Sequence, residues 1–289
     1  MNLPNLLIVG AAKSGTTSLH NYLKQHPDIF MSNHKEPHFL INNEIGVNRI
    51  PKGINNLQDY SNLFSHGTSH KYRGESSAMY LQFPEIAIKN IDRYLDEDVK
   101  IIIMLRNPIE RAFSGYQHVK RYNSDEDLDF EDALEISEQR YFTNNNITPA
   151  SRYIHIGMYN EFVRKFKTKF KTNVHIIIYK DFINNTNQEL SRLFSFLGIK
   201  DVQIDFNMQY MVGGWKWKND LFRRIFMKRH FLKKFIPFKR FFRAIFKLFA
   251  TDSVEQLDDK VREKLIGIYK DDIKNLSTFL NVDLNFWTK

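Results

Sequence analysis

The sequence predicts an α/β fold, in which a doubly wound parallel sheet is flanked by helices on both faces. Three apolar runs, at residues 6–9, 100–105 and 174–179, are rich in branched side chains and have the length of strands. A segment with helical character follows each run. Because continuous apolar strands that alternate with helices are typical of parallel sheets buried on both faces, we expect one such sheet.

The first strand and the first helix enclose a turn made of small residues. Residues 6–9 (LLIV) stand directly before Gly10, so we predict a buried strand that opens into a turn. Residues 14–25 are predicted to form the helix that follows.

The other two strand–helix pairs repeat this pattern. Residues 100–105 (KIIIML) are the second strand, and residues 108–120 are the helix after it. Pro108 falls in the first turn of that helix, where its missing N–H costs nothing. Residues 174–179 (VHIIIY) are the third strand, before a helix that we expect to end at Leu197.

Length and composition predict a single folded domain. The chain has 289 residues, 42% hydrophobic and 26% charged, which is ordinary for a globular protein with a substantial core. There is no internal repeat and no low-complexity linker, so we predict one domain over residues 1–289. A basic, Phe-rich helical insertion is expected at about residues 219–250. The absence of cysteine excludes disulfides, cysteine-ligated metals and cysteine nucleophiles.

The basic insertion carries the whole excess of positive charge. Ten Lys or Arg and no Asp or Glu lie between Leu221 and Thr251, and the other 32 basic residues balance the 33 acidic ones. A diffuse surface that coats nucleic acid is therefore not expected, whereas a local anionic partner is. No apolar stretch reaches the roughly 18 residues that span a bilayer, and the start lacks the basic region of a secretory signal. We therefore expect a cytoplasmic protein.

Two apolar stripes run through the basic insertion, and they allow three interpretations. Apolar residues recur at helical spacing from Phe238 to Phe249, and a similar stretch precedes Pro237. Both stripes would pack on the core in the first interpretation. In the second, residues 221–249 lie on an anionic membrane surface, which would place the protein peripherally at the inner face of the membrane. In the third, an anionic polymer crosses the basic face.

The turn after the first strand has the features of a phosphate-binding loop. Small residues and backbone N–H groups beside a positive helix end suit an anion. Hydroxyl donors are supplied by Ser14, Thr16, Thr17 and Ser18. Gly10 and Gly15 have the spacing of the nucleotide triphosphatase loop, but Lys13 lies before the second glycine instead of after it. We therefore predict phosphate binding without the usual magnesium arrangement.

A second phosphate-binding element is expected after the second strand. Arg106 closes that strand at the edge where parallel sheets bind ligands, and Ser114 lies two helical turns further on. An arginine and a hydroxyl can together clamp one phosphate. Taken alone the pair is not specific, because an arginine at a strand end often forms only a surface ion pair.

Together the two motifs resemble those of the 3′-phosphoadenylyl sulfate (PAPS)-dependent sulfotransferases, above all the glycan-modifying branch that includes the heparan sulfate sulfotransferases. That family binds the 5′-phosphosulfate with its first motif and the 3′-phosphate with its second. Residues 35–39 (KEPHF) look like the family's K-E-x-x-F segment. Residues 74–80 (GESSAMY) resemble its G-E-x-[ST]-P-x-Y segment, with Ala78 where proline is usual. The likeness covers most of the chain and is patchy only in the basic segment.

The resemblance implies a fold related to the nucleotide kinases, with a P-loop-like architecture. It also implies PAPS as the donor and 3′-phosphoadenosine 5′-phosphate as the product. No metal is expected, because Lys13 and Arg106 supply the positive charge. The residues that the resemblance assigns to donor binding in these two motifs are Lys13, Ser14, Gly15, Thr16, Thr17, Ser18, Arg106 and Ser114.

The same resemblance implies roles in catalysis. Sulfuryl transfer should resemble phosphoryl transfer, with charge building on the leaving phosphate, and Lys13 occupies the position that stabilises it. Glu36 matches the general base that takes the proton of the acceptor. His118 aligns with a histidine implicated in catalysis, and Lys35 and His38 would line the acceptor site.

A further donor-binding element is implied at residues 213–216 (GGWK), where the family places a flexible loop over the cofactor. Gly214 permits motion of such a loop. Trp215 would cover the adenine or the acceptor, and Lys216 would reach the sulfonate or the 3′-phosphate.

Two other functions stay open on the sequence alone. An ATP-dependent phosphotransferase would use the same loop, although the displaced lysine argues against it. A non-catalytic membrane-surface or polyanion-binding protein on the same fold would explain the Phe-rich basic segment. For a sulfotransferase we expect a hydroxyl or amine of a carbohydrate or glycolipid as acceptor, near residues 39–59 and 125–149, which carry no recognisable signature. No feature of the sequence indicates an oligomeric state.

Overall fold

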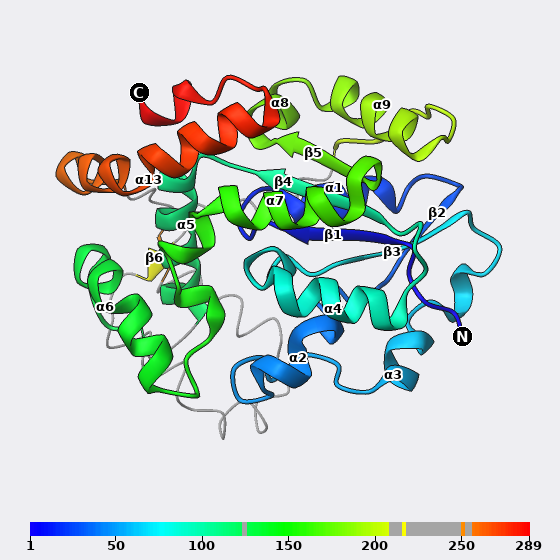
Figure 1. Ribbon diagram of the computed structural model, residues 1–289, viewed down its shortest axis with the longest axis horizontal. Helices are drawn as coiled ribbons and strands as arrows, with labels where there is room; N and C mark the ends of the chain where they lie inside the picture. Colours follow the sequence, from blue (N-terminus) through cyan, green and yellow to red (C-terminus); the bar gives the residue numbers. More distant parts are fainter. Residues whose placement is uncertain (123–125, 208–215, 218–249, 252–255) are drawn as a thin grey trace.

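A five-stranded, all-parallel sheet forms the centre of the protein (Figure 1). The computed structural model describes residues 1–122, 126–207, 216–217, 250–251 and 256–289. The strands of the main sheet are β1 (Leu6–Gly10), β2 (Ile29–Met31), β3 (Tyr72–Ser76), β4 (Lys100–Leu105) and β5 (Val174–Ile178). Their order across the sheet is β2-β3-β1-β4-β5.

The central position of β1 creates the crevice in which a ligand is expected. It pairs with β3 on one side, where Leu6 lies opposite Gly74, and with β4 on the other, where Leu6 lies opposite Lys100. The connection after β1 leads to β2 in one half of the sheet, and the connection after β3 crosses to β4 in the other half. In open parallel sheets the carboxyl ends of strands at such a point form the ligand-binding site.

Helices cover both faces of the sheet. They are α1 (Thr16–Leu23), α2 (Phe39–Ile45), α3 (Leu57–Asn62), α4 (Pro84–Tyr94), α5 (Pro108–Tyr122), α6 (Phe130–Thr143), α7 (Tyr159–Phe170), α8 (Tyr179–Asn184), α9 (Thr186–Leu197) and α13 (Asp259–Leu280). Leu6 and Ile8 of β1 belong to an apolar cluster with α1 and α9, whereas Leu7 and Val9 belong to a second cluster with α4, α5, α7 and α13. Alternate residues of one strand are thus buried on opposite faces, as the continuous apolar runs predict. The predicted fold class is confirmed.

Two of the five strands are absent from the sequence-based prediction. β2 has only three residues, and β3 (YRGES) is polar, so neither forms an apolar run. Gly74 shows why β3 cannot carry large side chains throughout, because a Cβ there would lie 2.3 Å from the sulfur of Met31 on β2. In addition, the segment after β5 is two helices, α8 and α9, instead of one.

A small antiparallel ribbon stands apart from the main sheet. In it, β6 (Lys216–Trp217) pairs with β7 (Ala250–Thr251), so the two ends of the predicted basic insertion lie side by side. Apart from Ala250, the predicted insertion and both of its Phe-rich stripes lie outside the described residues. Among the helices that the structure does describe, none is long and apolar enough to cross a membrane.

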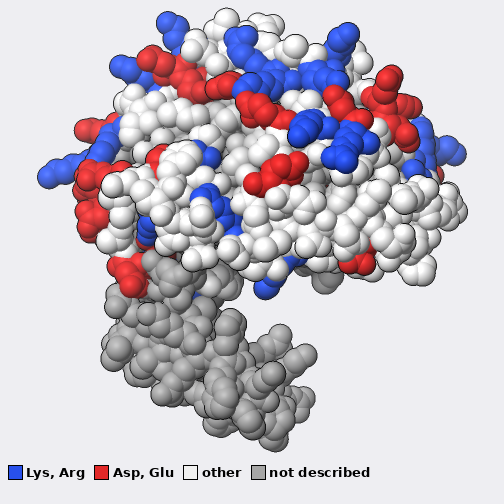
Figure 2. Space-filling view, turned by 60° about the horizontal axis from the view of Figure 1, so that its bottom comes forward, with Lys and Arg blue, Asp and Glu red and all other residues white. Residues whose placement is uncertain are grey.

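Charges on the described surface are mixed in sign. Figure 2 shows Lys and Arg interspersed with Asp and Glu over one half of the face, and a broad area with few charges over the other half. The balanced composition outside residues 221–251 predicts such a surface.

Candidate active site

A cavity of about 1100 Å³ opens where the carboxyl ends of the strands meet. Its lining comes from the segments that follow β1, β3, β4 and β5, together with the segment around residue 36 and the start of α13. The cavity brings together eleven of the residues predicted from the sequence. These are Lys13, Gly15, Thr16, Thr17, Ser18, Lys35, Glu36, His38, Arg106, Ser114 and His118.

The turn after β1 presents backbone N–H groups to this cavity. Gly15 ends the turn in a left-handed conformation (φ 87°), and α1 begins at Thr16 without a side-chain cap and without acidic residues in its first turn. The first N–H groups of a helix have no partner inside the helix, so they are available to an anion. A Cβ at Gly15 would lie 3.0 Å from the Tyr179 ring, so this position is restricted in space as well as in conformation. The side chain of Ser14 differs from its neighbours, since it is fully buried and does not line the cavity.

Arg106 is held against the turn by three groups. Its Nη1 donates to the carbonyl oxygen of Lys13 (3.3 Å), and its Nη2 donates to Oε2 of Glu110 (3.1 Å). Its guanidinium also lies over the Tyr179 ring, 5.1 Å from the centroid. The end of β4 is thereby tied to the turn after β1, so the two predicted phosphate-binding motifs form one surface.

The Lys13 ammonium is partly deprived of water and of negative partners. Burial lowers the pKa of Lys13 to about 8, and the charges of Arg121, Arg106 and Lys35 act in the same direction. A cluster of cations in a partly buried site is destabilised by mutual repulsion, which a bound anion relieves. Arg121 was not predicted from the sequence, because it lies near the end of α5, outside both motifs.

The segment that carries Glu36 is attached to the end of β3. The Glu36 N–H donates to the carbonyl of Ser76 (2.9 Å), and the His38 N–H donates to Oγ of Ser77 (3.0 Å). In return, the Ala78 N–H donates to Oε2 of Glu36 (2.9 Å). The carboxylate of Glu36 therefore has a fixed position at the rim of the cavity.

Three of the predicted functional residues have strained backbones. Lys13 (φ 69°), Glu36 (φ 62°) and His38 (φ 53°) adopt left-handed conformations. Among the described non-glycine residues the only others with positive φ are Lys171 and Asn281. Such conformations cost about 1–3 kcal/mol each and persist where surrounding contacts impose them, typically at functional sites.

Charges around Glu36 keep it ionised. Burial alone would raise the pKa of Glu36, but the charge of Lys35 and the hydrogen bonds from Lys35 and Ala78 lower it below its usual value. Glu36 is in an ion pair with Lys35, and Nε2 of His38 lies 3.3 Å from Oε2. At neutral pH the carboxylate is therefore negatively charged.

The histidines of the cavity are neutral at physiological pH. Burial lowers the pKa of His118 to about 4, aided by the charges of Lys13 and Arg121. Burial also lowers the pKa of His38 below its usual value, despite the opposing charge of Glu36. Within the described residues, no group of three or more His, Asp or Glu side chains is placed to hold a metal ion.

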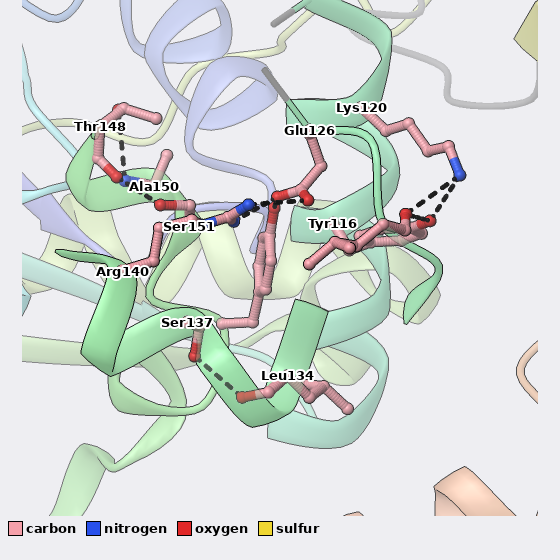
Figure 3. A network of polar contacts seen from close by, with 11 residues as sticks. Tyr116, Lys120, Glu126, Leu134, Ser137, Arg140, Thr148, Ala150 and Ser151 are labelled. Carbon is pink, nitrogen blue, oxygen red and sulfur yellow. Dashed lines mark hydrogen bonds and ion pairs between the residues drawn. The ribbon is translucent and has the colours of Figure 1, made fainter. Parts of the chain in front are cut away.

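A buried polar network joins the segment before α6 to the segment after it (Figure 3). Glu126 is buried and accepts from Nη2 (2.6 Å) and Nη1 (3.1 Å) of Arg140, and it also accepts from the hydroxyl of Tyr153. The Thr148 hydroxyl accepts from the N–H of Ala150 (3.3 Å), and Ala150 lines the cavity. The segment after α6 is thus fixed beside the site, in the region expected to contact the acceptor.

A group of residues that was not predicted from the sequence lines another part of the cavity. We call it the aromatic group, because three of its five members are Tyr or Phe. It comprises Tyr22 on α1 and Tyr179, Phe182, Ile183 and Thr186 on and after α8. The rings of Tyr22 and Phe182 lie 6.1 Å apart. For the four residues other than Tyr22, the position after β5 is a signal that could have found them, because ligand-binding residues gather at the carboxyl ends of parallel strands.

The predicted third donor element is not described. Gly214 and Trp215 lie outside the described residues, and of Lys216 only the backbone, in β6, is described. Their proposed contacts with the donor stay predictions.

The fold and the cavity define a P-loop-like α/β protein with a cavity rich in Lys and Arg at the carboxyl edge of its sheet. A family described as "Sulfotransferase domain" matches residues 3–267, so the chain belongs to the sulfotransferase family. The enzymes of this family use PAPS, and the predicted enzyme class, a PAPS-dependent sulfotransferase domain, is confirmed.

Curated proteins and solved structures agree with the assignment. Carbohydrate sulfotransferase 15 of Mus musculus is 24% identical over 249 residues, which cover 68% of this chain and 44% of that protein. The human bifunctional heparan sulfate N-deacetylase/N-sulfotransferase 1 is 32% identical over 120 residues, which cover 42% of this chain and 13% of that protein. This chain thus spans less than half the length of these relatives. A sulfotransferase structure from Alicyclobacillus acidocaldarius is 27% identical, with a TM-score of 0.77 over 100% of both chains.

Proposed function

We propose that this protein transfers the sulfuryl group of PAPS to a hydroxyl or amine of a carbohydrate or glycolipid acceptor. One observation carries this proposal: Lys13 and Arg106, which suit the donor, line the same cavity as Glu36, a fixed and ionised carboxylate that suits the acceptor. Transfer of a sulfuryl group to a hydroxyl or amine requires a surface that holds the donor and a base that takes the proton of the acceptor.

The residues present fit the donor. PAPS carries three anionic groups and a purine. Within the described part of the chain, the cavity is lined by five Lys or Arg side chains, among them Lys13 and Arg106. It also offers the first-turn N–H groups of α1, hydroxyls and an aromatic group that includes Tyr22 and Phe182. The turn from Lys13 to Ser18 would hold the 5′-phosphosulfate, and Arg106 with Ser114 the 3′-phosphate. The adenine would lie against the aromatic group. The volume also exceeds the roughly 300–1,000 Å³ of an ordinary ligand pocket, which leaves room for part of an acceptor.

Lys13 and Glu36 have complementary roles in the proposed reaction. The donor supplies an activated sulfuryl group and a phosphate that leaves with added negative charge. Lys13 stabilises that charge, and an anion beside it favours the protonated state that burial and neighbouring cations disfavour. Glu36 accepts the proton of the attacking hydroxyl or amine.

The remaining polar residues assist at the acceptor side. His118 is neutral, so it acts as a hydrogen-bonding or proton-accepting group and not as a second cation. Lys35 and His38 flank Glu36 and contact the acceptor. Lys216, Trp215 and Gly214 close over the donor in this proposal, as the family resemblance implies.

The carbohydrate acceptor is supported by the relatives. The two named above are a carbohydrate sulfotransferase and an enzyme whose name specifies N-sulfation of heparan sulfate. The second name specifies transfer to nitrogen, whereas the first names only a carbohydrate. We extend the same acceptor class to this chain.

A membrane-surface location is proposed from the basic segment, residues 221–249. A similar protein, 32% identical over 126 residues that cover 42% of this chain and 25% of that protein, is named membrane-associated sulfotransferase kil1 of Dictyostelium discoideum. Aromatic and basic residues at helical spacing suit an anionic bilayer surface.

Binding to vesicles of phosphatidylcholine with and without phosphatidylglycerol tests this location against packing of the segment on the core. Replacing Phe241 and Phe242 by Glu should abolish binding to the anionic vesicles while activity on a soluble acceptor persists, and failure of the wild type to bind them would refute the idea.

Donor binding is the first test of the proposed function. Calorimetric titration with 3′-phosphoadenosine 5′-phosphate in the absence of metal should show micromolar affinity, and ATP should bind more weakly. Equal binding of ATP, or no binding of either nucleotide, would contradict the proposed donor site.

The acceptor class is tested by mass analysis of the products formed from PAPS with N-deacetylated heparosan, chondroitin and a neutral glycolipid. If none of these acceptors gains a sulfate, the proposed acceptor class is wrong.

A further inference from the structure

A fully buried carboxylate lies close to residues 36–40, which we call the catalytic segment because they include the proposed base, Glu36. Glu75, in β3, is completely shielded from solvent and does not line the cavity. Its Oε1 accepts from the hydroxyls of Tyr60 (3.0 Å) and Tyr80 (2.6 Å), and its Oε2 accepts from Oγ of Ser77 (2.8 Å). Three hydroxyl donors on one carboxylate satisfy a buried charge without a basic partner.

Two of these hydroxyls also accept hydrogen bonds from the segment that begins α2. The His38 N–H donates to Oγ of Ser77 (3.0 Å), and the Leu40 N–H donates to the hydroxyl of Tyr80 (3.3 Å). Because each N–H supplies the hydrogen of its own bond, each hydroxyl must direct its hydrogen elsewhere, and Glu75 is its acceptor. The direction of both chains of hydrogen bonds is therefore fixed, from backbone to hydroxyl to carboxylate.

The segment held in this way needs external support. His38 is the N-terminal cap residue of α2, it adopts a left-handed conformation, and its side chain makes no capping hydrogen bond. Glu36, two residues earlier, is also left-handed. The hydroxyls of Ser77 and Tyr80 therefore take the place of a cap and hold a strained backbone that would otherwise relax.

We propose that Glu75 is a positioning residue, which acts through Ser77 and Tyr80 to hold Glu36 and His38 in the geometry that deprotonates the acceptor. This inference rests on the proposed role of Glu36 as the base. Burial raises the pKa of Glu75 to about 7, against the lowering effect of its three hydroxyl donors and with the help of the Glu36 charge. Burial of a carboxylate costs free energy, so its presence here indicates a specific role for the hydrogen bonds that it accepts.

Two buried tyrosines provide a matched test. Tyr60 and Tyr80 are both completely buried, and both donate to Oε1 of Glu75, but only Tyr80 also accepts from the catalytic segment. Tyr60→Phe and Tyr80→Phe each remove one hydroxyl that donates to Oε1 of Glu75. Only Tyr80→Phe also removes the acceptor of the Leu40 N–H. Ser77→Ala removes the parallel link to His38. Glu75→Gln is less decisive, because a buried amide in place of the carboxylate can prevent folding.

Turnover should separate the variants while donor binding does not. Release of 3′-phosphoadenosine 5′-phosphate from PAPS, with N-deacetylated heparosan as probe acceptor, should fall about 10- to 100-fold in kcat for Ser77→Ala and Tyr80→Phe, the usual cost of a small misplacement of a reacting group. Tyr60→Phe should keep nearly the wild-type kcat. Calorimetric affinity for 3′-phosphoadenosine 5′-phosphate should be the same in all three variants. An equal loss in Tyr60→Phe and Tyr80→Phe, or an unchanged Ser77→Ala enzyme, would overturn the inference.

A second measurement requires no turnover and separates this inference from the proposed function. NMR titration of the His38 ring reports its burial, which lowers its pKa in the intact segment. Ser77→Ala should raise the pKa of His38 toward its ordinary value, whereas Tyr60→Phe should leave it unchanged. An inactive wild-type protein that does not bind the nucleotide would refute the proposed function, and identical His38 titrations in Ser77→Ala and the wild type would refute the positioning role.

Discussion

The two sides of the active-site cavity are built in different ways. On the donor side, the turn from Lys13 to Ser18 is continuous with β1 and α1, and it lines the cavity where the uncapped start of the helix leaves N–H groups without partners inside the helix. On the acceptor side, residues 35–38 continue no strand, and their position comes from hydrogen bonds to residues 76–78 at the end of β3. One side depends on local backbone geometry and the other on contacts between distant segments.

Because of this difference, we expect substitutions on the two sides to affect different quantities, donor affinity and turnover. Substitutions of donor-side groups that only bind should change donor affinity, because the local turn is otherwise intact. Substitutions on the acceptor side should change turnover, because they move the base relative to a donor that still binds.

Replacing the base should give the largest effect and the clearest separation. In Glu36→Gln we expect kcat to fall about 10²- to 10⁴-fold, the usual contribution of a positioned general base. Affinity for 3′-phosphoadenosine 5′-phosphate should not fall, since Glu36 repels an anionic donor. Steady-state release of this nucleotide and calorimetry measure the two quantities. Glu44→Gln, on the exposed surface of α2, is the matched control, and a donor affinity that falls as steeply as kcat would erase the distinction between the two sides.

Lys13 lies on the donor side, but its replacement should change turnover as well as donor affinity. It binds the donor, but its proposed charge acts most strongly on the leaving phosphate in the transition state. We therefore expect Lys13→Met to lower kcat about 10²- to 10³-fold, as for other groups that stabilise developing charge. Lys13→Arg retains the charge and should recover part of the loss. An unchanged kcat at saturating PAPS would show that Lys13 only binds.

Arg106 should show the opposite behaviour. Arg106→Ala removes charge-assisted hydrogen bonds to the 3′-phosphate, so the affinity for 3′-phosphoadenosine 5′-phosphate should fall about 10- to 100-fold. With saturating PAPS, kcat should stay close to that of the wild type. Arg106→Lys should restore affinity only in part, because lysine lacks the planar group that lies over Tyr179. A loss of kcat with unchanged affinity would place Arg106 in the chemical step.

The smallest expected effect is a shift of the pH profile on the acceptor side. Lys35 lowers the pKa of Glu36, so Lys35→Met should raise it. A base with a higher pKa is protonated at higher pH, and the acidic limb of the kcat profile should therefore move to higher pH. Lys24→Met is the control, since the Lys24 ammonium bonds to Asn33 instead (2.6 Å). A shift to lower pH, or an equal shift in the control, would contradict the role of Lys35.

Much of the fold and of the donor side follows from the sequence, because the relevant signals are local. The apolar runs of β1, β4 and β5 required no knowledge of their neighbours, and buried strands of a parallel sheet are apolar on both faces. The loop around Lys13 and Gly15 was recognisable from its spacing, because a phosphate-binding turn needs small residues in a continuous stretch. Arg106 followed from its place at the end of a strand.

The tertiary structure alone decided which distant residues support that chemistry. The polar strand β3 gave no apolar signal, yet its position beside β1 brings Ser76, Ser77 and Ala78 against the segment of Glu36. Arg121 and Tyr22 line the cavity on helices α5 and α1, which start at the carboxyl ends of the neighbouring strands β4 and β1. The carboxylate of Glu75 acquires its three donors from α3 and the end of β3 only when the chain is folded. Local sequence specifies strands and turns through short-range backbone preferences, whereas hydrogen bonds between remote segments depend on the order in which the strands pair.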